Sequence, residues 1–184
     1  MNAQQATPRR DRRTTDTRRR IESTALRMFV SNGFAETSLK DIAEELGITK
    51  AAVYYHFPAK ADLARSVFQP FITDVDALLD SFDPVGTATR REVLTAYAEA
   101  LLPHRLALTA TLRDPTGLAG LDVEGASDRW RSRLVALLFT EDTPRTRVRA
   151  TVALGGLTRA LQLPEIEDGT VRAVAVDAAV DALG

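Results

Sequence analysis

Three residues at a distinctive spacing constrain the fold more than any other feature: the small Ala43, the glycine Gly47 and the branched Val53. Two helices that cross steeply after a short turn need a small side chain at their closest approach and glycine in the turn. They also need a branched side chain where the second helix returns to the first. An ordinary helical hairpin uses the same residue types, so the spacing alone leaves both a helix-turn-helix and a hairpin open.

Apolar residues recur at helical spacing through the rest of the chain. One stripe lies in residues 21–29 and a longer one in residues 63–82, where Pro70 is expected to kink the helix. Capping signals at Thr89-Arg90-Arg91-Glu92 and Thr143-Pro144 open two further helices. The sequence shows no convincing strand alternation, and it predicts an all-α protein of about nine helices.

Composition narrows the class of protein. The 184 residues, 45% of them apolar, suffice for a buried core. The chain has no cysteine, and its two histidines, His56 and His104, leave little for a metal site, so we expect neither a metal nor a cofactor. It also lacks a P-loop, a GxSxG elbow and a paired-histidine motif, which argues against an enzyme. Without a long apolar run or a signal peptide, we expect a soluble cytoplasmic protein that has no membrane partner.

The charge is distributed unevenly along the chain. Residues 1–65 hold 12 basic and 8 acidic residues, whereas the remainder holds 12 basic and 17 acidic residues. A basic N-terminal third suggests that this end meets a polyanion. Residues 1–14, with four clustered arginines, are expected to be disordered. They are either a solvated tail or an arm that contacts DNA.

The second helix of the predicted pair, from about Thr49 to Phe57-Pro58, carries side chains suited to a major groove. Small residues would let the helix backbone approach the bases, while hydroxyl, ammonium and imidazole groups would reach bases or phosphates. Tyr55 is expected to pack inside the protein. Lys60 lies in the first turn of the next helix, where the helix dipole disfavours a cation and a bound phosphate would reverse the penalty. The candidate residues in the second helix are Thr49, Lys50, Ala51, Ala52, Tyr54 and His56.

Residues 33–63 resemble the DNA-binding signature of the TetR family. The resemblance rests on Gly33-Phe34, Thr37-Ser38, Ile42-Ala43, Gly47-Ile48, Val53-Tyr54-Tyr55-His56-Phe57 and Lys60-Ala61-Asp62-Leu63. It implies a three-helix DNA-binding domain at residues 15–62 and a helical ligand-binding and dimerisation domain at 63–184. It also implies a homodimeric repressor that a small-molecule effector releases from a palindromic double-stranded DNA operator. By position, it adds Thr37, Ser38 and Lys40 to the DNA contacts and keeps Lys60 among them.

Two sets of residues in the body are candidates for dimerisation and ligand binding. The last two helices carry small and branched residues that permit close packing, although an intrachain core helix shows the same pattern. The candidates for the dimer interface are Val148, Val152, Gly155, Gly156, Val171, Val174 and Ala178. Polar and aromatic side chains between residues 63 and 139 are candidates for ligand contact: Tyr97, His104, Arg105, Arg113 and Trp130.

Two rival interpretations of the whole chain remain. An enzyme is disfavoured by the missing motifs. A helical ligand-binding or scaffolding protein without a DNA function would explain the body but not residues 37–60. A mechanistic hypothesis accompanies the resemblance: a ligand in the body moves the long helix at Pro70 and thereby tilts the head, the alternative being that Pro70 makes a simple structural bend.

Overall fold

The computed structural model describes residues 9–83, 87–114 and 123–184, and these residues form nine α-helices and one short 3-10 helix. No strand occurs among them, which confirms the all-α prediction. In chain order the elements are α1 (Arg9–Asn32), α2 (Leu39–Leu46), α3 (Lys50–His56), α4 (Lys60–Ser81), α5 (Arg90–Leu101), the 3-10 helix η1 (Leu102–His104), α6 (Arg105–Arg113), α7 (Val123–Leu138), α8 (Pro144–Ala160) and α9 (Asp168–Leu183).

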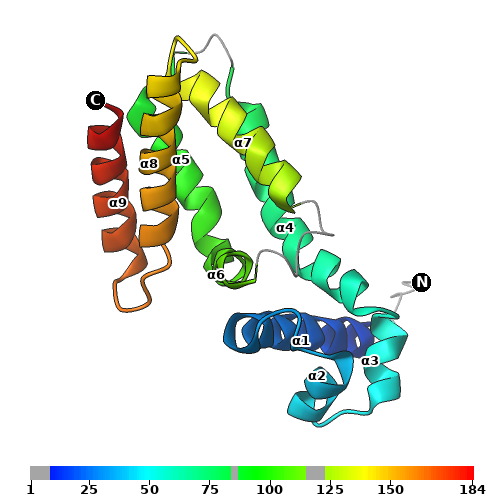
Figure 1. The fold of residues 1–184 in the computed structure, drawn as a ribbon. Coiled ribbons are helices and arrows are strands. Elements are labelled where there is room, and N and C mark those ends of the chain that lie inside the picture. The colour runs from blue at the N-terminus through cyan, green and yellow to red at the C-terminus, as the bar shows by residue number, and fades with distance from the viewer. Residues whose placement is uncertain (1–8, 84–86, 115–122) are drawn as a thin grey trace, which may run out of the picture.

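Helices α1 to α3 form a small head at one end of the molecule (Figure 1). The turn between α2 and α3 has the local chemistry that the sequence predicts. Ser38 and Asp41 form a capping box at the start of α2, and Gly47 ends that helix in the left-handed conformation with φ of 63°. Val53 is fully buried and Ala43 nearly so, at the crossing of the two helices. The steeply crossing pair is therefore confirmed.

Helix α1 begins earlier than the sequence predicts. Disorder is predicted for residues 1–14, but the structure continues the helix back to Arg9. Arginine is a good helix former, and no proline or glycine interrupts the sequence between Arg9 and Asn32. The correction concerns residues 9–14, because residues 1–8 lie outside the described residues.

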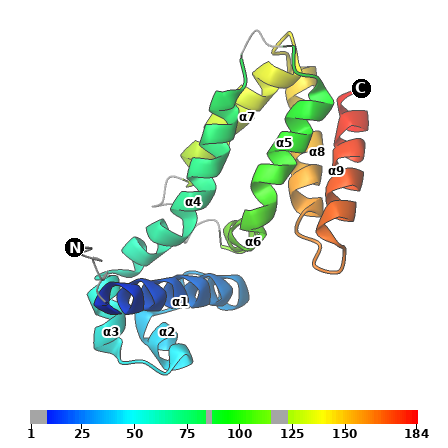
Figure 2. The ribbon, with the colours of Figure 1, turned by 180° about the vertical axis from the view of Figure 1, so that it is seen from behind.

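The body consists of α5 to α9 and the greater part of α4, which leads out of the head (Figures 1 and 2). Helices α8 and α9 lie side by side and antiparallel in both views, and α5 packs against α9. The predicted start signals are present, since Thr89 caps α5 and Thr143 caps α8, each through a capping box. Head and body meet at two places, along α4 and where α6 packs against α1.

Candidate functional site

Helix α3 presents an outer face that contributes nothing to the core of the head. Of its seven residues, only Val53 is buried. Lys50, Ala51 and Tyr54 are exposed, Tyr54 to 42%, whereas Ala52 and His56 are half-buried. The Lys50 ammonium lies 5.3 Å from the centre of the Tyr54 ring, so these side chains form one polar and aromatic surface.

Tyr55 corrects a prediction, because it does not pack inside the protein. Its side chain is 78% exposed and contacts the His56 ring at 5.2 Å between centroids. Two residues along an α-helix are about 200° apart, which places Tyr55 almost opposite the buried Val53. The helical period therefore carries the signal for an exposed Tyr55, which belongs with the outer face of α3.

Three further candidates surround the start of α2 and α3. The Ser38 hydroxyl accepts from the Asp41 backbone N–H at 3.2 Å, and the Thr49 hydroxyl accepts from Ala52 at 3.2 Å. Lys40 is exposed and pairs with Glu44 at 3.2 Å along the surface of α2. All three side chains lie at the surface of the head, and the two hydroxyls already serve as helix caps.

Thr37 is a second correction, because its side chain does not lie on the surface. It is only 1% exposed, and its hydroxyl donates to the carbonyl of Gly33 at 2.8 Å. A second contact with the carbonyl of Met28 is 3.4 Å long. The Gly33 carbonyl directly follows α1, where backbone acceptors lack helical partners, and Met28 lies in the last turns of that helix. Thr37 thus closes the end of α1, and its hydroxyl is occupied within the head.

The Lys60 ammonium also has partners within the head. It donates to the carbonyls of Phe34 and Ala35 at 2.9 and 3.1 Å and lies 4.4 Å from the Phe34 ring centre. These contacts hold the loop between α1 and α2 against α4. They offset the unfavourable position of a cation in the first turn of a helix without any phosphate.

Arg18 is a positioning residue that the sequence does not single out. Its guanidinium donates to the Ser66 hydroxyl of α4 at 2.9 Å and to the His56 carbonyl at 3.4 Å, and it lies 4.4 Å from the Phe57 ring centre. One side chain of α1 therefore holds the end of α3 and the start of α4 together. Its sequence neighbours Arg19 and Arg20 look identical in pattern, which is why no sequence signal distinguishes it.

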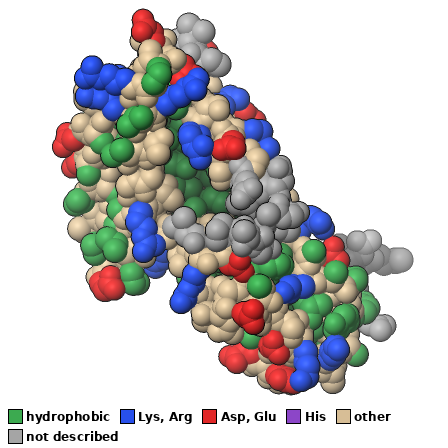
Figure 3. Space-filling view, in the orientation of Figure 1, with side chains coloured by type: hydrophobic (Ala, Val, Ile, Leu, Met, Phe, Trp, Pro, Cys, Tyr) green, Lys and Arg blue, Asp and Glu red, His purple; other side chains and the backbone are tan. Residues whose placement is uncertain are grey.

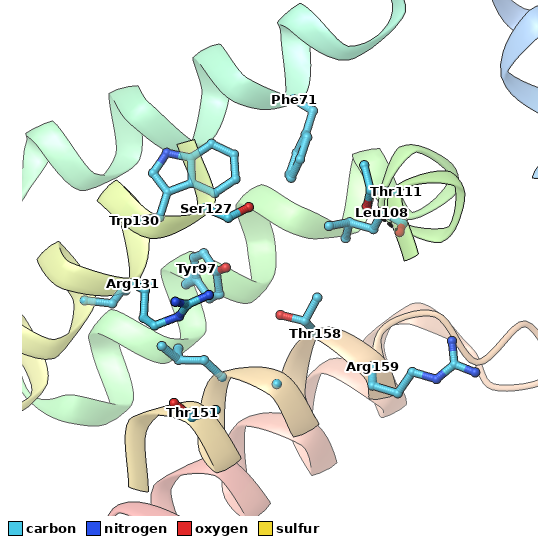
Figure 4. Close-up of a pocket in the computed structure, with 13 residues that line it drawn as sticks. Phe71, Tyr97, Leu108, Thr111, Ser127, Trp130, Arg131, Thr151, Thr158 and Arg159 are labelled. Carbon is cyan, nitrogen blue, oxygen red and sulfur yellow. Dashed lines mark hydrogen bonds between the residues drawn. The ribbon is translucent and has the colours of Figure 1, made fainter. Parts of the chain in front are cut away.

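A cavity of about 370 Å³ lies within the body. In the space-filling view the body is hollowed at its centre, where hydrophobic side chains are visible (Figure 3). Helices α4 to α8 supply its described lining, and Figure 4 shows the polar and aromatic members. The lining residues are Phe71, Tyr97, Leu108, Thr111, Ser127, Trp130, Arg131, Leu134, Thr151, Leu154, Gly155, Thr158 and Arg159.

Two of the five predicted ligand residues, Tyr97 and Trp130, line this cavity, and three do not. His104 bonds Asp74 at 2.7 Å, and Arg105 forms an ion pair with Asp168 of α9. Arg113 reaches the head and donates to the carbonyl of Val30 at 2.5 Å. These are corrections with a common cause, since each polar group finds an acceptor on a neighbouring helix that the sequence cannot identify.

Tyr97 and Trp130 are held differently in the cavity wall. The Trp130 indole N–H donates to Asp76 of α4 at 2.6 Å, which fixes the ring against that helix. Burial raises the pKa of Tyr97, whereas the Thr158 hydroxyl and the Arg131 charge act in the opposite direction. Tyr97 is therefore a neutral phenol at physiological pH. The sequence did not point to Arg131 or Thr158, because helical periodicity does not show which polar residues border a cavity.

Most of the predicted dimer residues are exposed on α8 and α9. Val148, Val152 and Val174 are 64%, 60% and 62% exposed. Gly155, Gly156 and Ala178 are exposed too, although Gly155 also lines the cavity. Val171 is the correction, because it is only 3% exposed and belongs to the core. Apolar residues occur on all sides of α9, so periodicity alone does not separate its inner face from its outer face.

Neither a membrane span nor a metal cluster occurs among the described residues. None of their helices is long and apolar enough to span a bilayer. Within residues 9–83, 87–114 and 123–184, no three His, Asp or Glu side chains gather in a way that could hold a metal ion.

A steeply crossing helix pair with an exposed second helix, mounted on a separate helical body, defines the class of helix-turn-helix regulators. A family model described as "Bacterial regulatory proteins, tetR family" matches residues 21–67, which lie in α1 to α4. Over residues 21–67 the chain is thus similar to the TetR family of transcriptional regulators.

Similar proteins support this assignment over different lengths. The probable regulator ArpR of Pseudomonas putida is 35% identical over 96 residues, which cover 49% of this chain and 45% of that protein. The chain thus spans about half the length of this curated relative. EthR of Mycolicibacterium smegmatis is 26% identical over 85% of this chain and 74% of its own length. A TetR-like regulator structure from Rhodococcus sp. RHA1 covers 97% of this chain and 98% of its own, with a TM-score of 0.69 at 23% identity. This last likeness shows the fold.

Proposed function

We propose that the protein is a sequence-specific DNA-binding regulator whose helix α3 enters the major groove. The observation that carries the proposal is the outer face of α3, where Lys50, Tyr54 and Tyr55 are exposed and serve no core. Small Ala51 and Ala52 let the backbone approach the base edges, and the tyrosine hydroxyls and Lys50 are donors for phosphates or bases. A DNA target also favours a cytoplasmic location.

The surrounding contacts would position α3 on the duplex. Ser38, Lys40 and Thr49 lie at the surface near the starts of α2 and α3. His56 at the end of α3 adds a further donor. Lys60 has one ammonium proton left after its two bonds to the loop carbonyls, so a phosphate contact remains compatible with its structural role.

A homodimer would place two heads on a palindromic operator. The exposed valines of α8 and α9, together with the small Gly156 and Ala178, would supply the apolar surface for this interface. Two copies of this surface would pack as a four-helix interface related by a two-fold axis. A two-fold protein calls for a two-fold operator, with half-sites about one helical turn apart.

We further propose repression that is relieved by a ligand in the body cavity. Phe71, which lines the cavity, directly follows Pro70 within α4, and α4 leads to the head. Because Pro70 has no N–H, the helix lacks one backbone hydrogen bond there and bends more easily. Pro70→Ala should weaken ligand-induced release of DNA. If the coupling between ligand and DNA is unchanged in Pro70→Ala, the hinge is wrong.

A gel-shift assay with DNA from the region upstream of the protein's own gene tests DNA binding. Lys50→Ala should weaken a sequence-specific shift about tenfold or more, in keeping with the 1–3 kcal/mol of a good base contact. Arg145→Ala is the matched control, since it removes an exposed cation from the body at the start of α8. Equal losses in both variants, or no sequence-specific shift by the wild type, would favour a helical binding protein without a DNA function.

A further inference from the structure

We propose that the body cavity binds an amphipathic organic anion: an apolar ring or chain that carries a single carboxylate, with the carboxylate against Arg131. The consequence for transcription rests on the proposed function above. The ligand class itself rests on the described cavity wall alone.

The apolar part of the ligand would lie against the aromatic side of the cavity. Phe71 and Trp130 meet edge to face, with ring centroids 5.2 Å apart. Leu108, Leu134 and Leu154 continue this surface. The volume of about 370 Å³ lies within the usual range of roughly 300–1,000 Å³ for small-molecule sites, at its lower end. The cavity therefore suits a compact apolar body rather than a large one.

The polar side of the cavity offers donors. The hydroxyls of Thr111 and Thr151 donate to carbonyls of their own helices at 2.8 and 2.9 Å, so their protons are already used. Thr158 and Tyr97 point into the space between α5 and α8, and the Arg131 guanidinium lies beside the Tyr97 ring (Figure 4). The buried Tyr97 keeps its proton because burial raises its pKa. Tyr97 and Thr158 hydrogen-bond each other, so one hydroxyl proton of this pair remains beside the Arg131 guanidinium. These donors favour a ligand that accepts hydrogen bonds.

The charges of the described lining favour an anion. The lining contains two arginines and neither aspartate nor glutamate. Arg159 turns away from the cavity in Figure 4 and bonds Gln162 at 3.2 Å, which leaves Arg131 as the cation that faces inward within the described lining. Its partner Asp128, at 2.9 Å, lies outside the lining. The two side chains are 56% and 73% exposed, so their pairing is weak and a carboxylate can share the guanidinium.

Trp130 makes the proposal directly measurable, because it is the only tryptophan in the sequence and lines the cavity. Its fluorescence can be titrated in the full-length protein with phenylbutyrate, phenylbutyramide and phenylbutylamine, which share one apolar body and differ in the head group. We expect the acid to bind about tenfold more tightly than the neutral amide, the ratio that one charge-assisted hydrogen bond supports. The cationic amine should bind more weakly than either.

Two variants assign the preference to a residue. Arg131→Gln should bring the affinities of the acid and the amide together by weakening the acid, with the amide little changed. Arg159→Gln removes an equal charge at the rim and should keep the preference for the acid. Thermal unfolding of both variants checks that they fold. Overturning results are an amide or amine that binds wild type as tightly as the acid, a preference that survives in Arg131→Gln, or no saturable signal with the acid at millimolar concentration.

The DNA assay separates this proposal from the proposed function. If the acid binds selectively through Arg131 but leaves the operator complex intact, the ligand class stands and ligand-induced release fails. If a neutral or cationic compound releases the operator while the acid does not bind, release stands and the ligand class is wrong.

Discussion

Removal of the buried hydroxyl of Thr37 separates a structural role from a DNA contact. Thr37→Val keeps the shape of the side chain but leaves the carbonyl of Gly33 without the donor that now lies 2.8 Å away. An unsatisfied buried acceptor costs about 1–3 kcal/mol. Gly33 is only partly buried, so water can replace part of the lost bond and the lower half of that range applies, about 1–2 kcal/mol.

The expected loss translates into a measurable shift. For a chain of this length, a destabilisation of 1 kcal/mol lowers the melting temperature by about 2–4 °C, so Thr37→Val should melt about 2–8 °C below wild type. Its operator affinity, measured well below the melting temperature, should stay within about twofold because the hydroxyl does not lie at the surface.

Tyr54→Phe is the matched control, since it also removes one hydroxyl, but from a side chain that is 42% exposed on α3. It should melt like wild type and bind the operator more weakly. Thermal unfolding by circular dichroism and a fluorescence anisotropy titration at fixed salt give both quantities. If Thr37→Val instead loses operator affinity at unchanged stability, Thr37 contacts DNA and the reasoning from burial is refuted.

Three other changes have equally definite outcomes. Lys60→Met keeps the apolar stem but loses the two hydrogen bonds to the loop carbonyls and the contact with Phe34. Denaturant unfolding should therefore show a free energy of unfolding lower by about 1–2 kcal/mol. An unchanged stability would show that these contacts do not stabilise the loop. Val152→Glu places a charge in the proposed dimer interface, on a side chain that is 60% exposed in the single chain. The variant should still fold, and light scattering should detect monomers. Persistent dimers would place the interface elsewhere. Hydrogen bonds from the side chain and the backbone of Ser38 lower the pKa of Asp41 below 3.8. The stability that these bonds contribute is therefore complete above pH 3.8 and is lost as the pH falls through the lowered pKa. The stability advantage of wild type over Ser38→Ala should therefore shrink in acid, and an advantage independent of pH would contradict the role of the carboxylate.

Local chemistry explains why much of the fold is predictable. Gly47 ends α2, and Thr89 and Thr143 begin α5 and α8, because each of these ends depends on residues within a few positions in sequence. The steep crossing of α2 and α3 is predictable for the same reason, since a short turn joins the two helices. The length of α1 is less predictable. Polar sequence before Thr14 is compatible with both a solvated chain and a solvated helix, and the structure contains the helix.

Side-chain partners from distant parts of the chain explain what the sequence could not supply. Three polar side chains bond an acceptor on another helix: His104, Arg105 and Arg113. No local sequence pattern predicts such a pairing. Val171 and Val174 differ only in the direction they face on a helix that is apolar on all sides. Tertiary packing determines both the partners of these polar side chains and the buried face of α9. The sequence period reveals a buried face only when polar residues occupy the opposite face.

The cavity and the head are linked by elements that belong to both. Helix α6 lines the cavity with Leu108 and Thr111, and immediately beyond them Arg113 donates to the Val30 carbonyl. Asp114, next in sequence, accepts from the Ala35 N–H at 2.9 Å, in the loop that leads to α2.

A ligand that displaces the wall at Leu108 would therefore act on a helix whose last turn is bonded to the head. Allosteric coupling requires such an element to differ between two states. The end of α6 and Lys60 of α4 both bond the loop that precedes α2. A shift of α6 would therefore move this loop and the start of α2. The ligand control proposed above would therefore use the hydrogen-bonded contact at the end of α6 as well as the bend that Pro70 permits in α4.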